Sequence, residues 1–129
     1  MADLYNPEGI HPPLGGYHHC AVIPARAQLI TIAGQVGMYA DGTMAEGIHG
    51  QAEAAFRNVL TALEAHRFKA SDLVKLTIFI TDRAYLEDMR AARNAVLGDE
   101  IKPPSTLLVV SGLAAPEMLI EVEAMAARG

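Results

Sequence analysis

The sequence predicts a mixed α/β (α+β) domain with the element order β-β-α-β-α-β-β. Three segments carry this prediction because their apolar residues recur with clear periods. Apolar positions three and four residues apart indicate a helix from about Ile48 to His66. Between Leu73 and Thr81, apolar and polar residues alternate, which is typical of a strand with one buried face. A second helix is expected from about Tyr85 to Leu97, with Gly98 as its C-terminal cap.

The other strands are shorter and are placed by their composition. Tyr17 to Ile23 is apolar and stops at a proline, and Gln28 to Ala33 is rich in β-branched residues, so the two are expected to form a hairpin. The segment before Tyr17 is rich in proline and glycine and is expected to be irregular. The last two strands are expected at Thr106 to Ser111 and at Met118 to Ala126.

This order of elements favours a mixed sheet with both helices packed on one face. No third helix is expected for the other face, so a second subunit is expected to cover it. The composition agrees, because 51% of the 129 residues are hydrophobic and only 19% are charged, which is rich in apolar residues for so small a monomer. One domain spanning residues 1–129 and assembled as a homo-oligomer is therefore the expected organisation.

The final strand carries two carboxylates on one face. Alternation places Glu121 and Glu123 on one side and Ile120, Val122 and Ala124 on the other. If the apolar side meets the helices, the carboxylates point toward the uncovered side. On a solvated edge this is an ordinary amphipathic pattern, whereas in a cleft between subunits a carboxylate needs a partner or a catalytic role. The periodicity alone leaves both interpretations open.

Charge and composition argue against several classes of function. The net charge of -5, the pI near 5.4 and the scattered basic residues provide no patch for nucleic acid. No apolar run approaches the ~18 residues that a bilayer span requires, and no signal peptide is apparent, so a cytoplasmic location is expected. The histidines show no metal-ligand spacing, so no metal site is expected. Cys20 is the single cysteine, which excludes an internal disulfide.

Six segments follow one another at a distinctive spacing: Asn6 to Gly9 (NPEG), Gly15 to Val22 (GGYHHCAV), Ile32 to Gly37 (IAGQVG), Asn58-Val59 within the first helix, Asp72 to Asp82 (DLVKLTIFITD) and Leu113 to Ala126 (LAAPEMLIEVEAMA). In this order they resemble the Rid family, also called the YjgF or reactive-intermediate deaminase family. No single segment decides the resemblance, but the colinear set covers nearly the whole chain.

The resemblance implies a chorismate-mutase-like fold and a homotrimer built around a barrel of sheets, with ligand clefts between neighbouring subunits. It also implies an activity. The family's well-known members hydrolyse small reactive enamines and imines, such as 2-aminoacrylate, to a 2-oxo acid and ammonia, and they use neither a metal nor an organic cofactor. The implied partners are a small-molecule substrate and further copies of the same chain.

Site residues are implied where the sequence matches the family's pattern. Tyr17 falls on the cleft tyrosine, and Glu121 falls on the glutamate that positions the attacking water. Gly34 falls on the glycine of a Ser-Gly-Gln turn in which Ala33 replaces the serine.

Two positions depart from that pattern. The family's substrate-binding arginine is replaced by Ser105, and its usual asparagine on the second helix is replaced by Arg93. A guanidinium grips a carboxylate with two charge-assisted hydrogen bonds, which a serine hydroxyl cannot do. We therefore expect Ser105 to line the pocket and Arg93 or backbone amides to hold an anionic group, on a substrate other than simple 2-aminoacrylate.

The pair His18-His19 is the most distinctive local feature. If both lie in a strand, their rings point to opposite faces, so only one of them can line a given pocket. Such a histidine could bind substrate or act as an acid or base near neutral pH, and the alternative is a hydrogen-bonded structural histidine. For Cys20, a buried thiol is the ordinary expectation, and a nucleophilic role requires an activating histidine.

Two functional hypotheses follow. The first is a cofactor-independent hydrolytic deaminase of a small enamine or imine, with Glu121 and Tyr17 as catalytic residues. The second is a non-catalytic ligand-binding or regulatory trimer that has kept the fold. A third interpretation, an endoribonuclease or translation inhibitor, is disfavoured by the acidic composition.

Overall fold

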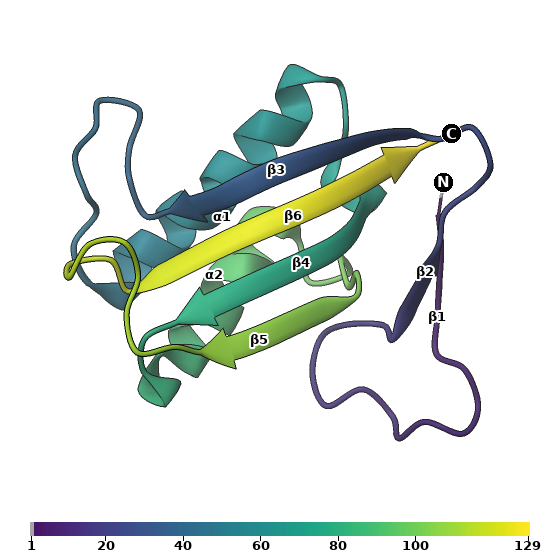
Figure 1. The fold of residues 1–129 in the computed structure, drawn as a ribbon, viewed down its shortest axis with the longest axis horizontal. Coiled ribbons are helices and arrows are strands. Elements are labelled where there is room, and N and C mark those ends of the chain that lie inside the picture. The colour runs from purple at the N-terminus through teal and green to yellow at the C-terminus, as the bar shows by residue number, and fades with distance from the viewer. Residues whose placement is uncertain (1) are drawn as a thin grey trace.

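The computed structural model describes residues 2–129 and contains a four-stranded sheet. The strands are β3 (Gln28–Val36), β4 (Leu73–Ile80), β5 (Ser105–Val109) and β6 (Ile120–Arg128), and they lie in the order β3-β6-β4-β5. β4 and β5 run parallel, whereas β6 is antiparallel to both β3 and β4. The expected mixed sheet is thus confirmed, and Figure 1 shows it as one twisted layer.

Both helices pack on the same face of this sheet (Figure 1). α1 (Gly47–Ala65) and α2 (Leu86–Leu97) lie within a residue or so of their expected bounds. Gly98 ends α2 with a φ of 105° and donates its N–H to the Asn94 carbonyl, as expected of a C-terminal cap. Short 3-10 turns, η1 (Ala70–Asp72) and η2 (Arg83–Tyr85), lead into β4 and α2. The α+β fold class predicted from the sequence is therefore correct.

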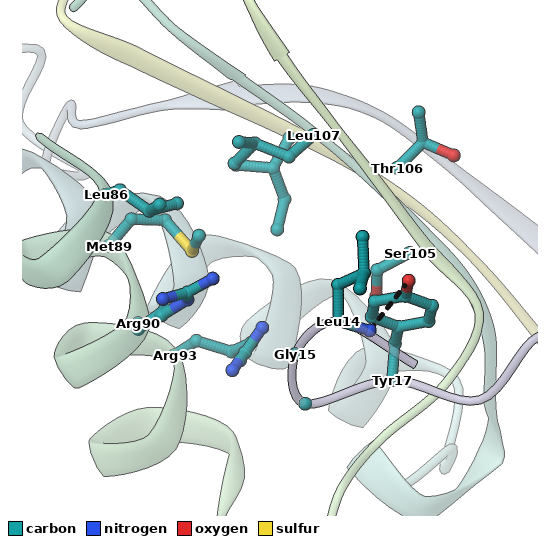
Figure 2. A pocket seen from close by; sticks show the side chains of 12 residues that line it. Leu14, Gly15, Tyr17, Leu86, Met89, Arg90, Arg93, Ser105, Thr106 and Leu107 are labelled. Atoms are coloured by element: carbon teal, nitrogen blue, oxygen red, sulfur yellow. Dashed lines mark hydrogen bonds between the residues drawn. The ribbon is translucent and has the colours of Figure 1, made fainter. Parts of the chain in front are cut away.

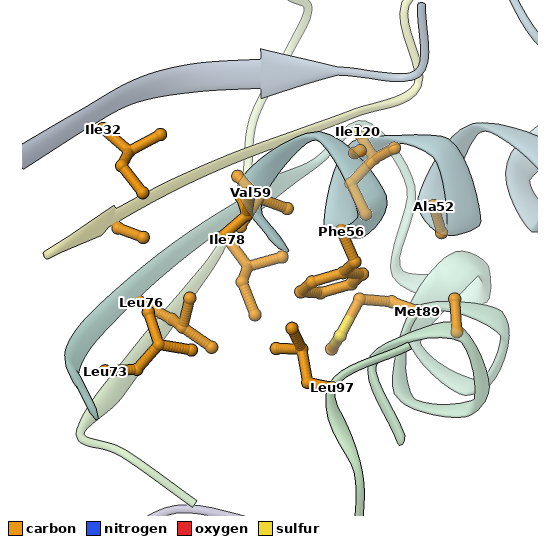
Figure 3. Packing of buried hydrophobic residues seen from close by; sticks show 14 of the residues in the cluster. Ile32, Ala52, Phe56, Val59, Leu73, Leu76, Ile78, Met89, Leu97 and Ile120 are labelled. Atoms are coloured by element: carbon orange, nitrogen blue, oxygen red, sulfur yellow. The ribbon is translucent and has the colours of Figure 1, made fainter. Parts of the chain in front are cut away.

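The core lies between the helices and the sheet (Figure 3). Phe56 and Val59 of α1 face Leu76 and Ile78 of β4 in one buried cluster, and Met89 joins it from α2. Burying each such side chain stabilises the fold by roughly 1.5–3 kcal/mol. The apolar stripe of the first helix is confirmed, because the apolar residues three and four positions apart in α1 are buried. The alternation of β4 is confirmed as well, because every second residue of the strand is buried.

The N-terminal part of the chain differs from the sequence prediction. Asp3–Tyr5 forms an additional strand, β1, and it pairs with β2 (Cys20–Val22) in a separate two-stranded ribbon. The predicted hairpin between the Tyr17–Ile23 segment and β3 is therefore wrong. A tight turn does connect them, with Arg26 at a φ of 66°, but β2 diverges from the sheet (Figure 1). The Pro- and Gly-rich lead-in is irregular only between β1 and β2.

The second face of the sheet is uncovered in the monomer. Along β6, Ile120, Val122 and Ala124 are buried against the helices, while Glu121 is half-buried and Glu123 is exposed. On this face the apolar edge strand β5 exposes Leu108, and Leu107 and Val109 are exposed on the helix side of the same strand. The orientation of the two glutamates matches the prediction.

Gln51 of α1 anchors the loop that leads into β6. Its side chain is buried, donates to the Glu117 carbonyl at 2.9 Å and accepts from the Leu119 N–H at 2.9 Å. Gly37 lies against the same helix so closely that a Cβ there would come within 2.5 Å of the Gln51 Cβ. These contacts fix the position of the segment that leads into β6 relative to α1.

Candidate functional site

A cavity of about 410 Å³ opens between α2, β5 and the loop that precedes β2 (Figure 2). α2 contributes Arg90 and Arg93, and the loop contributes Gly15, Gly16 and Tyr17. The rest of the lining is mainly apolar: Leu14, Ile78, Leu86, Met89, Ser105, Thr106 and Leu107. Three residues that the sequence marks as site candidates, Tyr17, Arg93 and Ser105, are thus brought together.

Arg93 is a buried cation that is only 7% exposed. Within residues 2–129, no carboxylate lies within ion-pair distance of its guanidinium, and the one side-chain hydrogen bond is a long one, 3.5 Å, from Nε to Asn94 Oδ1. Burial, and after it the charge of Arg90, lower the pKa of Arg93. Because arginine keeps its proton in proteins, the cavity contains an uncompensated positive charge.

Tyr17 presents its hydroxyl as a donor. The backbone N–H of Leu14 donates to Tyr17 Oη at 3.1 Å, so one lone pair of the phenol is occupied (Figure 2). The phenolic proton remains available to donate, since a phenol oxygen carries one proton and accepts elsewhere. The His19 ring packs edge-on against the Tyr17 ring, with the two ring centroids 5.6 Å apart. Tyr17 can therefore act as a positioned hydrogen-bond donor.

Ser105 lines the cavity, but its hydroxyl proton is engaged in a hydrogen bond within the protein. Ser105 Oγ donates to the carbonyl of Pro103 at 3.0 Å. It can accept a hydrogen bond from a ligand but cannot replace a positively charged clamp. The positive charge of the cavity therefore comes from α2 and not from β5.

Glu121 and Gly34 form a second group of site candidates. β3 carries a bulge between Ile32 and Gln35, at Ala33 and Gly34, and the Glu121 side chain crosses the chain there. A Cβ at Gly34 would overlap the carboxylate and lie 2.7 Å from its Cδ. Only glycine allows this close approach. Glu121 makes no side-chain hydrogen bond or ion pair with any described residue, so its half-buried carboxylate is free to accept.

The cavity and Glu121 lie on opposite faces of the sheet. Ser105 pairs with Leu76 of β4, and Glu121 pairs with Phe79 of the same strand. Leu76 and Phe79 are three residues apart and point to opposite faces, and paired residues share a face. Ser105 is therefore on the helix face and Glu121 on the open face. One chain alone does not bring Tyr17, Arg93 and Ser105 together with Glu121.

The two histidines do not line the cavity. Both precede β2, so the expectation that they alternate along a strand is wrong. His18 Nδ1 lies 2.7 Å from the Lys102 carbonyl, and His19 Nε2 lies 2.7 Å from the His11 carbonyl. A carbonyl only accepts, so each of these nitrogens carries a proton. Both rings therefore hold the loop in place. The next residue, Cys20, lies in β2, and its thiol is half-buried.

Three further residues of the cavity lining, Arg90, Gly15 and Gly16, were not predicted from the sequence. Arg90 stands three residues before Arg93, and that spacing on a predicted helix places both on one face. Gly15 and Gly16 let the loop approach the arginines, because a Cβ on Gly16 would lie 2.8 Å from Arg93 Nη2. Among residues 2–129, no cluster of three or more metal-ligating side chains occurs, and no helix is long and apolar enough to cross a membrane.

The chain is similar to known proteins over nearly its whole length. The family model described as endoribonuclease L-PSP matches residues 9–128. The RutC family protein YjgH of Escherichia coli (strain K12) is 29% identical over 117 residues, which cover 90% of this chain and 88% of that protein.

Solved structures share the fold. The crystal structure of YyfB from Yersinia pestis, described as a protein of unknown function of the conserved Rid protein family, matches with a TM-score of 0.86 and 26% identity, over 98% of both chains. TdcF from E. coli, solved with bound serine, matches with a TM-score of 0.73 and 21% identity over 91% of each chain. At that identity, the likeness to TdcF concerns the fold alone.

Proposed function

The chain belongs to the Rid family, and from this premise we propose that it is a cofactor-independent hydrolase that deaminates a small reactive imine or enamine. The observation that carries the proposal is the free carboxylate of Glu121, held over Gly34 on the uncovered face of the sheet. A carboxylate in that state can accept a proton from water. The expected substrate is other than simple 2-aminoacrylate, because Ser105 provides no cationic clamp.

The proposed site is shared between two copies of the chain in a homotrimer. The cavity with Tyr17 and Arg93 belongs to one copy, and Glu121 belongs to its neighbour. Two features support this arrangement: the opposite-face placement of Ser105 and Glu121, and the exposed apolar residues of β5. A partner that covers Leu108 on the open face would remove apolar surface from water, which favours association.

The chemistry needs only water and proton transfers. Glu121 takes a proton from a water molecule as the water oxygen bonds to the C=N carbon, and Tyr17 Oη gives a proton to the nitrogen. The proton of the new hydroxyl then moves to nitrogen, the C–N bond breaks, and a carbonyl compound and ammonia leave. The proton held by Glu121 returns to Tyr17. An enamine first tautomerises to the imine, as its carbon gains a proton from water and its nitrogen loses a proton to water. Arg93 holds an anionic group of the substrate throughout.

Ammonia release tests this proposal. Imines generated in situ from amino acids by an amino-acid oxidase are supplied, and their conversion is measured with and without the protein. Glu121→Gln should abolish the acceleration, while Glu123→Gln, the exposed neighbour on the same strand face, should retain it. No acceleration above background with any imine or enamine would refute the deaminase.

The second candidate, a non-catalytic ligand-binding trimer, is favoured by one observation. Ser105 stands where the family carries its substrate-binding arginine, and its hydroxyl is bound to the backbone of Pro103. For a binder, Glu121→Gln should leave ligand affinity unchanged and the wild type should release no ammonia. For the enzyme, the same substitution should remove turnover.

A further inference from the structure

The charge of the cavity specifies the kind of substrate more closely. Arg90 and Arg93 both extend from α2 toward the loop at Gly15 (Figure 2). Arg90 is the outer of the two, with a side chain that is 40% exposed, and its one ion pair in the described part of the chain is with Glu87 at 3.8 Å. The Glu87 side chain is 91% exposed, so it stays in water and cannot neutralise the cavity.

The terminal nitrogens of Arg93 also make no hydrogen bond with any described residue. No buried side-chain nitrogen among the described residues lacks a partner, and none of the hydrogen bonds involves the terminal nitrogens of Arg93. These nitrogens therefore keep some exposed area, and the cavity that Arg93 lines is where a ligand can reach them. A guanidinium offers several donors in a planar fork that matches a carboxylate.

We propose that the substrate carries two carboxylates, one held by Arg93 and one by Arg90, joined by a short hydrocarbon segment. This inference rests on the proposed function and names its substrate class. One carboxylate would balance only one of two like charges in a partly desolvated cavity, whereas two balance both. Leu86, Met89 and Leu107 also line the cavity and give it an apolar wall that matches a hydrocarbon segment. Gly15 and Gly16 keep the loop close enough to confine it.

Binding of simple acids tests the inference without any turnover. Succinate and butyrate have the same number of carbons and differ by one carboxylate, and calorimetric titration at fixed ionic strength compares them. Succinate should bind at least about tenfold more tightly, a difference of about 1.4 kcal/mol, because its second carboxylate makes a further charge-assisted pair. That preference should disappear in Arg90→Gln and Arg93→Gln. Arg57→Gln, an equal change of charge on exposed α1 surface, should retain it.

Three results would overturn the inference. Succinate and butyrate could bind equally, the preference could survive in Arg90→Gln, or inorganic phosphate could bind more tightly than succinate, which would indicate a compact dianion. If Arg93→Gln fails to fold, Arg90→Gln decides alone, because Arg90 is half-exposed and its replacement leaves the core intact.

The same experiments separate this inference from the proposed function. Selective succinate binding without ammonia release from any imine would refute the deaminase and leave the dicarboxylate site standing. Ammonia release from monocarboxylate imines as fast as from dicarboxylate imines would refute the dicarboxylate class and leave the deaminase standing.

Discussion

The carboxylate of Glu121 lies directly over the α-carbon of Gly34, at the bulge that interrupts the pairing of β3 with β6. The bulge brings two residues of β3 opposite one of β6 and turns the bare glycine toward the glutamate. The carboxylate of Glu121 therefore contacts the backbone at Gly34, and it makes no ion pair with a described residue. Its position depends on the absence of a side chain at Gly34.

Gly34→Ala is therefore expected to displace the carboxylate with little effect on folding. The added Cβ meets the end of a flexible side chain, which can move away. We expect kcat for ammonia release to fall by about tenfold or more, because small displacements of a catalytic group are costly, while ligand affinity changes little. In a Glu121→Gln background, the same substitution should have no further effect on kcat. An equal effect in both backgrounds would show that Gly34 acts independently of Glu121.

Tyr17→Phe should lower kcat by about 100-fold, as expected for the loss of a proton donor. The thermal midpoint should change little, because the Leu14 N–H that loses its acceptor is in an exposed part of the loop. Steady-state kinetics and a melting curve check the two parts separately. Tyr39→Phe, at an exposed tyrosine that is not part of the cavity lining, is the matched control and should retain full activity. A large loss of stability with unchanged kcat would indicate a purely structural tyrosine.

The stripe of α1 and the alternation of β4 can be predicted from the sequence, because burial of one face imposes the period directly. The pairing of β2 cannot, because its partner β1 is only three residues long and has no period of its own. The burial of Arg93 also cannot be predicted from the sequence. It depends on a loop that is distant in sequence and folds over α2, whereas a lone arginine on an amphipathic helix usually faces water.

Gln51→Ala should lower the free energy of unfolding by about 1–3 kcal/mol, because it leaves the Glu117 carbonyl and the Leu119 N–H without their partner. Urea denaturation followed by circular dichroism measures this change. Gln28→Ala, at an exposed glutamine of β3, should change the free energy of unfolding far less. Equal effects of the two substitutions would mean that the hydrogen bonds of Gln51 add nothing to the free energy of unfolding beyond the loss of a side chain.

Leu108→Glu should dissociate the assembly. Leu108 lies on the exposed edge strand β5, on the open face that a partner is expected to cover, and a charge there opposes burial. Sedimentation velocity should find a trimer for the wild type and a monomer for the variant. Thr61→Glu, on the exposed side of α1, should remain trimeric. A wild type that sediments as a monomer would contradict the shared site.

In the proposed trimer, one copy supplies Arg93 and its neighbour supplies Glu121, and subunit complementation tests this arrangement most directly. Arg93→Gln and Glu121→Gln chains, each inactive alone, are unfolded together, refolded as a mixture and assayed for ammonia release. In a ring of mixed subunits, about a quarter of the interfaces combine an intact Arg93 with an intact Glu121, so roughly that fraction of wild-type activity should return. A mixture as inactive as its two parents would contradict a site built from two copies.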